Sequence, residues 1–176
     1  MKSRDKYTGT AITLHWLMAL LIILGFLVGL YVADLPLSPQ KLRILAWHKW
    51  SGVTVFLLLL LRILWRLAHR APPLPASMSA LMKRLSALTH LAIYLLMAAV
   101  PVVGWLHSSA AGVSVVYFNL VPLPDLVGKD KALSHLFGEI HETLAWTLMG
   151  LVALHVAAAL KHQLVDRDNL LQRMRW

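Results

Sequence analysis

Apolar residues occur along this chain in four long runs that are separated by shorter, more polar segments. An α-helix rises about 1.5 Å per residue, so about 20 apolar residues cross the roughly 30 Å hydrocarbon core of a bilayer. The second run is long enough if Arg62 and Arg66 extend their charged ends toward the membrane surface. The pattern predicts four membrane-spanning helices over residues 11–32, 45–67, 85–107 and 139–163.

The composition supports a membrane protein and leaves little sequence for any other domain. Hydrophobic residues make up 59% of the 176 residues and charged residues only 14%, whereas soluble domains have about 25% charged residues. The chain contains no cysteine, which excludes disulfides, iron–sulfur clusters and thiolate ligands. We therefore expect one all-α domain over residues 1–176, an integral membrane four-helix bundle.

Basic residues are unevenly distributed between the two sides of the predicted bundle. The N-terminal segment, the link between the second and third helices and the C-terminal segment, each taken with the adjoining helix ends, carry twelve of the 17 Lys and Arg residues. The other two links and their adjoining helix ends carry five. Because cytoplasmic segments are enriched in basic residues, both termini are predicted to be cytoplasmic. The net charge of +9 then reflects topology, and we expect no nucleic-acid partner.

Four histidines are predicted to lie at two depths in the membrane. His15 and His155 fall at the cytoplasmic level, and His48 and His141 fall at the outer level. The 14-residue spacing from His141 to His155 is within about 40° of four helical turns, so both histidines face one side of the fourth helix about 21 Å apart. Each then needs a partner from another helix at its own depth.

Paired imidazoles at two levels indicate two six-coordinate haem b groups in an electron-transfer protein. Haem iron takes one axial ligand on each face, and four-helix bundles build such sites from facing helices. A lone intramembrane histidine is often only hydrogen-bonded to a neighbouring helix, but four that pair by depth favour ligation.

Other metal or transport chemistries fit the pattern less well. The sequence "HETLA" begins like a zinc-protease motif, but Ala145 stands in place of its second histidine. A copper or zinc site would gather its ligands at one depth. A proton relay through Glu142, or a haem-free transporter, leaves the paired depths unexplained.

Further polar residues suggest a possible quinone pocket at the cytoplasmic end. His90, His162 and Arg84 could donate hydrogen bonds and protons to a quinone there, although anchoring at the interface or contact with a haem propionate also explains them. Arg62 and Arg66 fit either propionate pairing or anchoring.

Other residues have two interpretations or none. Lys49, Lys129 and Lys131 could steer an anion toward the outer level, or form a solvated face. Glycines within the helices allow either close packing or clearance for a flat cofactor; they are Gly25, Gly29, Gly52, Gly104 and Gly150. No role is assigned to His69, His107 or His135.

Four motifs in order along the chain resemble the bacterial cytochrome b561 family. They are "ITLHWLMALLI", "WHKWSG", "THLAIYLLMAAVPVVGW" and "HETLAWTLMGLVALHVAAALKHQ", one in each predicted helix. The resemblance implies a four-helix dihaem b cytochrome of the bacterial inner membrane. It also implies His15 with His155, and His48 with His141, as the haem ligands, in agreement with the pairing by depth.

The resemblance further implies an oxidoreductase activity. It suggests a superoxide oxidase, in which superoxide is oxidised to dioxygen and ubiquinone is reduced to ubiquinol. The alternative is a haem b membrane subunit that passes electrons between quinone and a partner dehydrogenase or hydrogenase. Membrane lipid, ubiquinone and superoxide are thus the expected partners, and a redox subunit is possible but not required.

Overall fold

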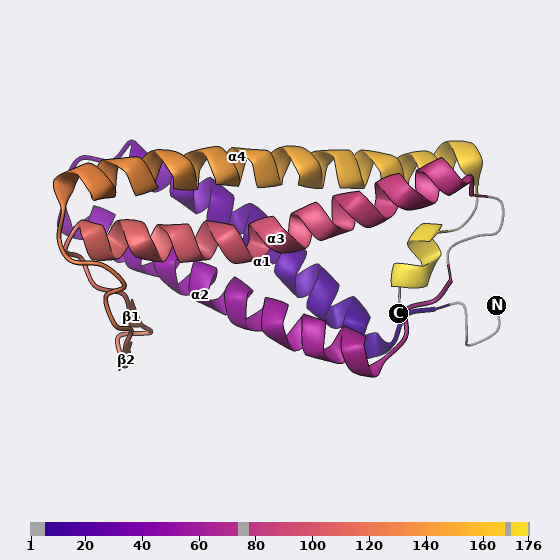
Figure 1. Ribbon diagram of the computed structural model, residues 1–176, viewed down its shortest axis with the longest axis horizontal. Coiled ribbons are helices and arrows are strands. Elements are labelled where there is room, and N and C mark those ends of the chain that lie inside the picture. Colours follow the sequence, from indigo (N-terminus) through magenta and orange to yellow (C-terminus); the bar gives the residue numbers. More distant parts are fainter. Residues whose placement is uncertain (1–5, 74–77, 168–169, 176) are drawn as a thin grey trace.

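Four long helices form an elongated bundle in the computed structural model, which describes residues 6–73, 78–167 and 170–175 (Figure 1). They are α1 (Gly9–Ala33), α2 (Pro39–Ala68), α3 (Ala80–Ala110) and α4 (Lys131–Lys161). Each helix is long and apolar enough to cross a membrane. The all-α, four-helix membrane fold predicted from the apolar runs is therefore confirmed.

The helices extend beyond the predicted membrane-crossing segments. Helix α2 begins at Pro39 rather than at residue 45, and α4 begins at Lys131 rather than at residue 139. Capping side chains set these starts, because Ser38 and Asp130 accept hydrogen bonds from the first turn of α2 and α4. Counting apolar residues finds only the apolar part of a helix, so α2 and α4 begin before the predicted spans.

The link between α3 and α4 contains a short β-hairpin that was not predicted. Strands β1 (Val116–Tyr117) and β2 (Val121–Pro122) pair antiparallel. The indole nitrogen of Trp50 donates to the carbonyl oxygen of Val116 at 2.7 Å, and Tyr117 Oη lies 2.9 Å from Thr54 Oγ1. These bonds fasten the hairpin to α2, and we call this end of the bundle the hairpin end.

Segments near the two ends of the chain meet at the opposite end of the bundle. After α4, the chain forms a π-helical turn, η2 (His162–Asp166), and a 3₁₀ helix, η3 (Leu170–Met174). The Tyr7 amide donates to the carbonyl oxygen of Arg173 at 3.3 Å, and Trp16 Nε1 donates to that of Met174 at 2.9 Å. We call this the termini end (Figure 1).

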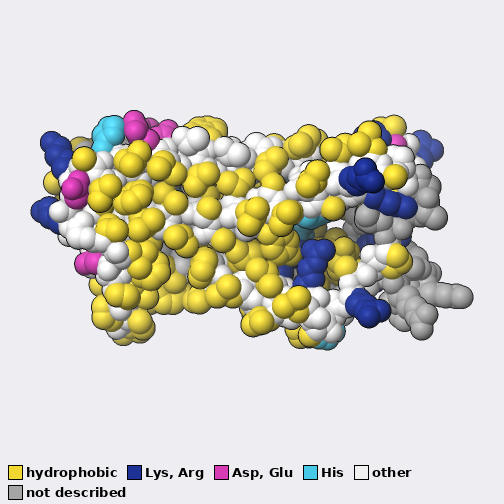
Figure 2. Space-filling view, in the orientation of Figure 1, with side chains coloured by type: hydrophobic (Ala, Val, Ile, Leu, Met, Phe, Trp, Pro, Cys, Tyr) yellow, Lys and Arg dark blue, Asp and Glu magenta, His cyan; other side chains and the backbone are white. Residues whose placement is uncertain are grey.

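The helices associate as two close pairs. Helix α3 packs along α4, α1 packs along α2, and α2 joins the pairs through α3, whereas α4 approaches the backbones of α1 and α2 closely at few points. A buried apolar cluster fills the middle of the bundle and comprises Met18, Val55, Leu59, Met97 and Leu148. On the face shown in Figure 2, hydrophobic side chains cover the middle of the bundle, and charged side chains gather toward both ends.

Candidate functional site

Two pairs of histidines bridge the space between α4 and the α1/α2 pair. The ring centroids of His48 on α2 and His141 on α4 are 6.0 Å apart. Those of His15 on α1 and His155 on α4 are 6.2 Å apart. The buried apolar cluster separates the two levels, because it includes Leu148, which lies midway between the two histidines of α4. The pairing by depth that the sequence predicts thus matches the arrangement of the rings.

The separation of the rings suits a metal ion between them. A metal–imidazole bond is about 2.0–2.1 Å long, so two imidazoles on opposite sides of one ion have centroids about 6 Å apart. Both pairs have this spacing. Each pair also lies where the helix backbones approach closely at few points, which suits a wide planar ligand. The residues present therefore fit haem, whose iron takes two axial ligands.

Backbone carbonyl groups orient both histidines nearer the hairpin end. Nδ1 of His48 lies 3.0 Å from the carbonyl oxygen of Gly25, and Nδ1 of His141 lies 2.9 Å from that of Val100. Because a carbonyl oxygen only accepts, Nδ1 carries the proton in each ring and donates it. The lone pair of Nε2 is then available to a metal, which is the usual second-shell arrangement for a ligating histidine.

Two glycines make room for these rings. A Cβ atom on Gly29 would lie 3.0 Å from Cε1 of His48, and one on Gly104 would lie 2.9 Å from Cε1 of His141. Gly52 instead lies beside Pro101, at ordinary contact distance. Two glycines therefore give clearance to imidazoles, and a third serves helix packing. Clearance for a flat cofactor stays a prediction.

The pair nearer the termini end has different surroundings. Nη2 of Arg62 lies 3.4 Å from Nδ1 of His15. A third imidazole, His90 on α3, lies 5.1 Å from the ring of His155, and its Nδ1 lies 2.7 Å from the carbonyl oxygen of Ser86. The spacing of His90 and His155 is shorter than an intervening metal ion requires, so His90 adjoins the His15–His155 pair without replacing either member.

The residues proposed for a quinone pocket are only partly brought together. His90 lies beside His155, as described. His162 lies at the end of α4, with Nδ1 3.1 Å from a carboxylate oxygen of Asp166. Within residues 6–73, 78–167 and 170–175, no hydrogen bond or ion pair joins Arg84 to either histidine. The pocket therefore stays a prediction.

The unassigned histidines occupy both ends of the bundle. His69 stacks on Trp65 at the termini end, with ring centroids 3.9 Å apart. His107 and His135 line a pocket of about 410 Å³ at the hairpin end, together with Lys131 and Glu139. His135 lies 3.5 Å from the carboxylate of Glu139. His69 and His135 thus make local contacts outside the two histidine pairs.

Two of the predicted outer lysines are held against the link between α3 and α4. Nζ of Lys49 donates to the carbonyl oxygen of Val113 at 3.0 Å. The aliphatic chain of Lys129 lies against Gly112, where a Cβ atom would lie 2.9 Å from the lysine Cδ. These cations therefore lie over the end of the bundle that holds His48 and His141.

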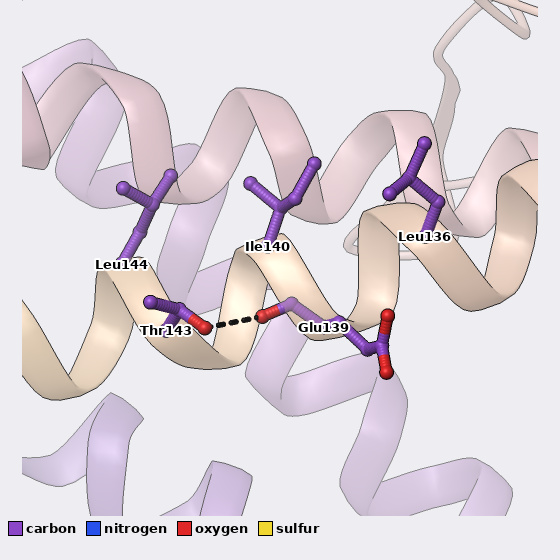
Figure 3. Close-up of a pocket in the computed structure, with 5 residues that line it drawn as sticks. All are labelled: Leu136, Glu139, Ile140, Thr143 and Leu144. Atoms are coloured by element: carbon purple, nitrogen blue, oxygen red, sulfur yellow. Dashed lines mark hydrogen bonds between the residues drawn. The ribbon is translucent and has the colours of Figure 1, made fainter.

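A second pocket, of about 200 Å³, lies on the outer face of α4 and contains no histidine (Figure 3). Leu136, Ile140 and Leu144 project from one helix, and the Thr143 hydroxyl donates to the backbone carbonyl of Glu139 at 2.8 Å. Among the described residues, no group of three or more His, Asp or Glu side chains could hold a metal ion. The paired histidines, with two ligands per level, are the arrangement that suits a metal-containing cofactor.

Sequence reasoning missed Tyr94 and Ser86. The Tyr94 hydroxyl accepts a hydrogen bond from Nε of Arg62 at 2.7 Å, and Ser86 supplies the carbonyl that His90 contacts. A signal was available, because both residues lie four positions from His90 and therefore share its helix face. The carbonyl groups of Gly25 and Val100 had no such signal, since every residue has one.

The protein is an integral membrane bundle of four helices. It contains two interhelical histidine pairs, each with a ring spacing that suits a metal ion. A family model of prokaryotic cytochrome b561 matches residues 6–176. The chain therefore belongs to the prokaryotic cytochrome b561 family, membrane electron-transfer proteins that bind haem b.

Curated relatives match over nearly the whole chain. Cytochrome b561 homolog 2 of Escherichia coli K12 is 32% identical and aligns with 97% of this chain and 91% of its own length. Probable superoxide oxidase CybB of Yersinia pestis is 31% identical over 96% of this chain and 95% of its own. Cytochrome b561 homolog 1 of E. coli K12 is 27% identical over 97% of each.

Proposed function

We propose that His15 and His155 are the axial ligands of one haem b, and that His48 and His141 are the ligands of a second. The observation that carries this proposal is the ring separation of 6.2 and 6.0 Å in the two pairs, which suits an iron ion between two imidazoles. The cofactor type follows from the family, and the existence of two pairs supports two haems.

The protein groups around each pair favour electron transfer over binding of a substrate at the metal. Histidine on both faces of an iron leaves no open coordination position. Bound haem would supply a one-electron carrier at each of two levels, about 21 Å apart along α4. The carbonyl groups of Gly25 and Val100 hold the imidazoles of one level in the tautomer that ligation requires.

The proposed orientation follows from the distribution of basic residues. The termini end, with the larger number of lysines and arginines, faces the cytoplasm of a bacterial cell, and the hairpin end faces the outside of the inner membrane. The His48–His141 level is then the outer one, and the His15–His155 level is the inner one.

The activity we propose is the oxidation of superoxide outside the membrane coupled to the reduction of ubiquinone. Each superoxide ion loses one electron and becomes dioxygen; ubiquinone takes up two electrons and two protons, so two superoxide ions give one ubiquinol. The similarity to a Yersinia pestis protein named probable superoxide oxidase supports this activity. Positive charge at Lys49, Lys129 and Lys131 would attract the anionic substrate.

Ubiquinone is proposed to bind at the termini end near His90, His162 and Arg84. His90 lies beside the inner pair, 5.1 Å from His155. The His162–Asp166 pair, at 3.1 Å, can hold and pass a proton, which the reduction of a quinone consumes. It lies within the π-helical turn η2, and such turns are frequent at functional sites.

The experiment uses the purified protein in lipid nanodiscs that contain ubiquinone, with superoxide supplied enzymatically. We expect a reduced-minus-oxidised spectrum with a b-type α band, and ubiquinol formation faster than in nanodiscs without protein. His48→Ala should abolish the ubiquinol, and His135→Ala should leave it unchanged. A preparation without a haem band would refute the ligand assignment. Two haems without superoxide-dependent ubiquinol, together with a copurified redox subunit, would instead favour the electron-relay subunit.

A further inference from the structure

Two arginines flank one tyrosine beside the inner histidine pair. Nε of Arg62 donates to the hydroxyl of Tyr94 at 2.7 Å. The guanidinium carbons of Arg62 and Arg66 lie 5.8 and 5.9 Å from the centroid of the Tyr94 ring. Two positive charges that share one tyrosine ring beside an apolar bundle are unfavourable unless an anion balances them.

No protein carboxylate supplies that anion in the described part of the chain. The ion pairs there involve His135, Lys161 and His162, and the last two share Asp166. Neither Arg62 nor Arg66 is paired with an acidic side chain within those ranges. Arg62 is half-buried, and a half-buried guanidinium without a counter-ion is costly. Arg66 is exposed but lies against the same tyrosine ring, so the arrangement indicates a site for an external anion.

The contact of Arg62 with His15 also indicates a site for an external anion. Arginine only donates hydrogen bonds, so the 3.4 Å approach of its Nη2 to Nδ1 of His15 requires that Nδ1 carry no proton. The proton would then lie on Nε2, the nitrogen that an iron ion needs. The outer histidines have the opposite tautomer, with Nδ1 donating to a carbonyl. If an anion drew Arg62 away from His15, Nδ1 could carry the proton and Nε2 would be free to bind iron.

We propose that Arg62, Arg66 and Tyr94 form a carboxylate-binding site for the propionate groups of the inner haem. This inference rests on the proposed ligation of that haem by His15 and His155. Two guanidinium groups match two carboxylates in charge and in hydrogen-bonding geometry. The Tyr94 hydroxyl accepts from Arg62 and keeps its own hydrogen for a carboxylate oxygen.

The surface of the bundle is consistent with a site open to one side. Figure 2 shows a hollow toward the termini end with basic side chains at its rim and a histidine visible inside it. Carboxylates at the edge of a porphyrin could reach basic groups there while the ring itself stays among the helices. The charge of the arginines would also favour the reduced haem, since reduction adds one electron to the same region.

The first test is a redox titration of the two haems in nanodiscs of zwitterionic lipid. We expect Arg62→Gln and Arg66→Gln to keep both haems and to lower the reduction equilibrium constant of the inner haem about tenfold, which corresponds to about 59 mV for one electron. Arg62→Lys should recover most of the loss because it keeps the charge. Arg70→Gln, which removes an exposed charge from the same end, should have no effect.

A second measurement identifies the anion directly. Redox-difference infrared spectra of protein whose haem carboxylates carry carbon-13 should show labelled bands that shift in Arg62→Gln and Tyr94→Phe but not in Arg70→Gln. Labelled bands that do not move would overturn the proposal. The proposal would also fail if anionic lipid changed the reduction potential of the inner haem in the unsubstituted protein but not in Arg62→Gln. That result would mean that a lipid phosphate occupies the site.

These outcomes are separable from failure of the proposed function. If the chain binds no haem at the His15–His155 level, His15→Ala leaves the haem content unchanged, and the ligand assignment fails. If that haem is present and neither arginine variant changes its potential, only the carboxylate site fails.

Discussion

Nδ1 of His141 on α4 lies 2.9 Å from the carbonyl oxygen of Val100 on α3. This contact links the two most closely packed helices of the bundle at the ring that we propose as a haem ligand. It sets both the tautomer and the rotation of the imidazole, because Nδ1 must point at the carbonyl while Nε2 points away from it. His48 is held in the same way by the carbonyl of Gly25 on α1.

Replacing any one of the four paired histidines should remove about one haem. His141→Ala deletes one of two axial ligands at its level, and the remaining ligand, His48, binds the iron more weakly alone. Haem per protein, measured as the pyridine haemochrome, should fall from two to about one. His69→Ala is the matched control, since His69 stacks on Trp65 outside both pairs. Retention of both haems in His141→Ala would contradict the assignment.

Adding a methyl group at Gly104 should disturb the outer haem site. Alanine favours a helix over glycine by about 1 kcal/mol, but its Cβ would lie 2.9 Å from Cε1 of His141, closer than a carbon–carbon contact allows. We expect Gly104→Ala to lose the outer haem or to change its electron paramagnetic resonance signal. Gly150→Ala, on the same bundle but with nothing within 4 Å of the added atom, should keep both signals. Equal behaviour of the two variants would contradict this role for Gly104.

Removing the proton-bearing pair at the end of α4 should separate haem reduction from quinone reduction. His162→Gln and Asp166→Asn break the 3.1 Å contact between these side chains without touching either histidine pair. In stopped-flow absorption, superoxide should still reduce the haems at the normal rate, while ubiquinol formation slows at least about tenfold, the usual scale for loss of a general acid. His135→Ala, at the opposite end, provides the control. Unchanged ubiquinol formation would remove His162 from the proposed quinone site.

Loss of the lysine next to His48 should reduce the capture of superoxide. Lys49→Gln removes a positive charge from the hairpin end, so the second-order rate of haem reduction should fall a few-fold at low ionic strength. The difference should shrink at about 0.15 M salt, where charges are screened over about 8 Å. Arg43→Gln removes an equal charge from an exposed position on the same helix and should have a smaller effect. An equal loss in both variants would indicate general surface charge rather than steering toward His48.

Local features of the chain were sufficient to predict the class of fold and the candidate ligands. Helix geometry is set by the backbone, so the 14-residue spacing of His141 and His155 placed both on one face whatever surrounds them. The length of the apolar runs likewise predicted four spans, because the hydrocarbon core of a bilayer has a nearly constant thickness. The same reasoning predicted starts for α2 and α4 that were too late, since their capped first turns precede the apolar runs. It gave no indication of the β1–β2 hairpin.

The sequence alone determined the number of long apolar helices and the spacing of the histidines along them. The tertiary structure decided which groups surround those histidines: the carbonyl of Val100, the missing side chain at Gly104, and the Arg62–Tyr94 contact beside His15. The physical reason is that depth depends on distance along one helix. The neighbours of a ring depend on how four helices rotate and cross, and many weak contacts between distant residues set that arrangement together.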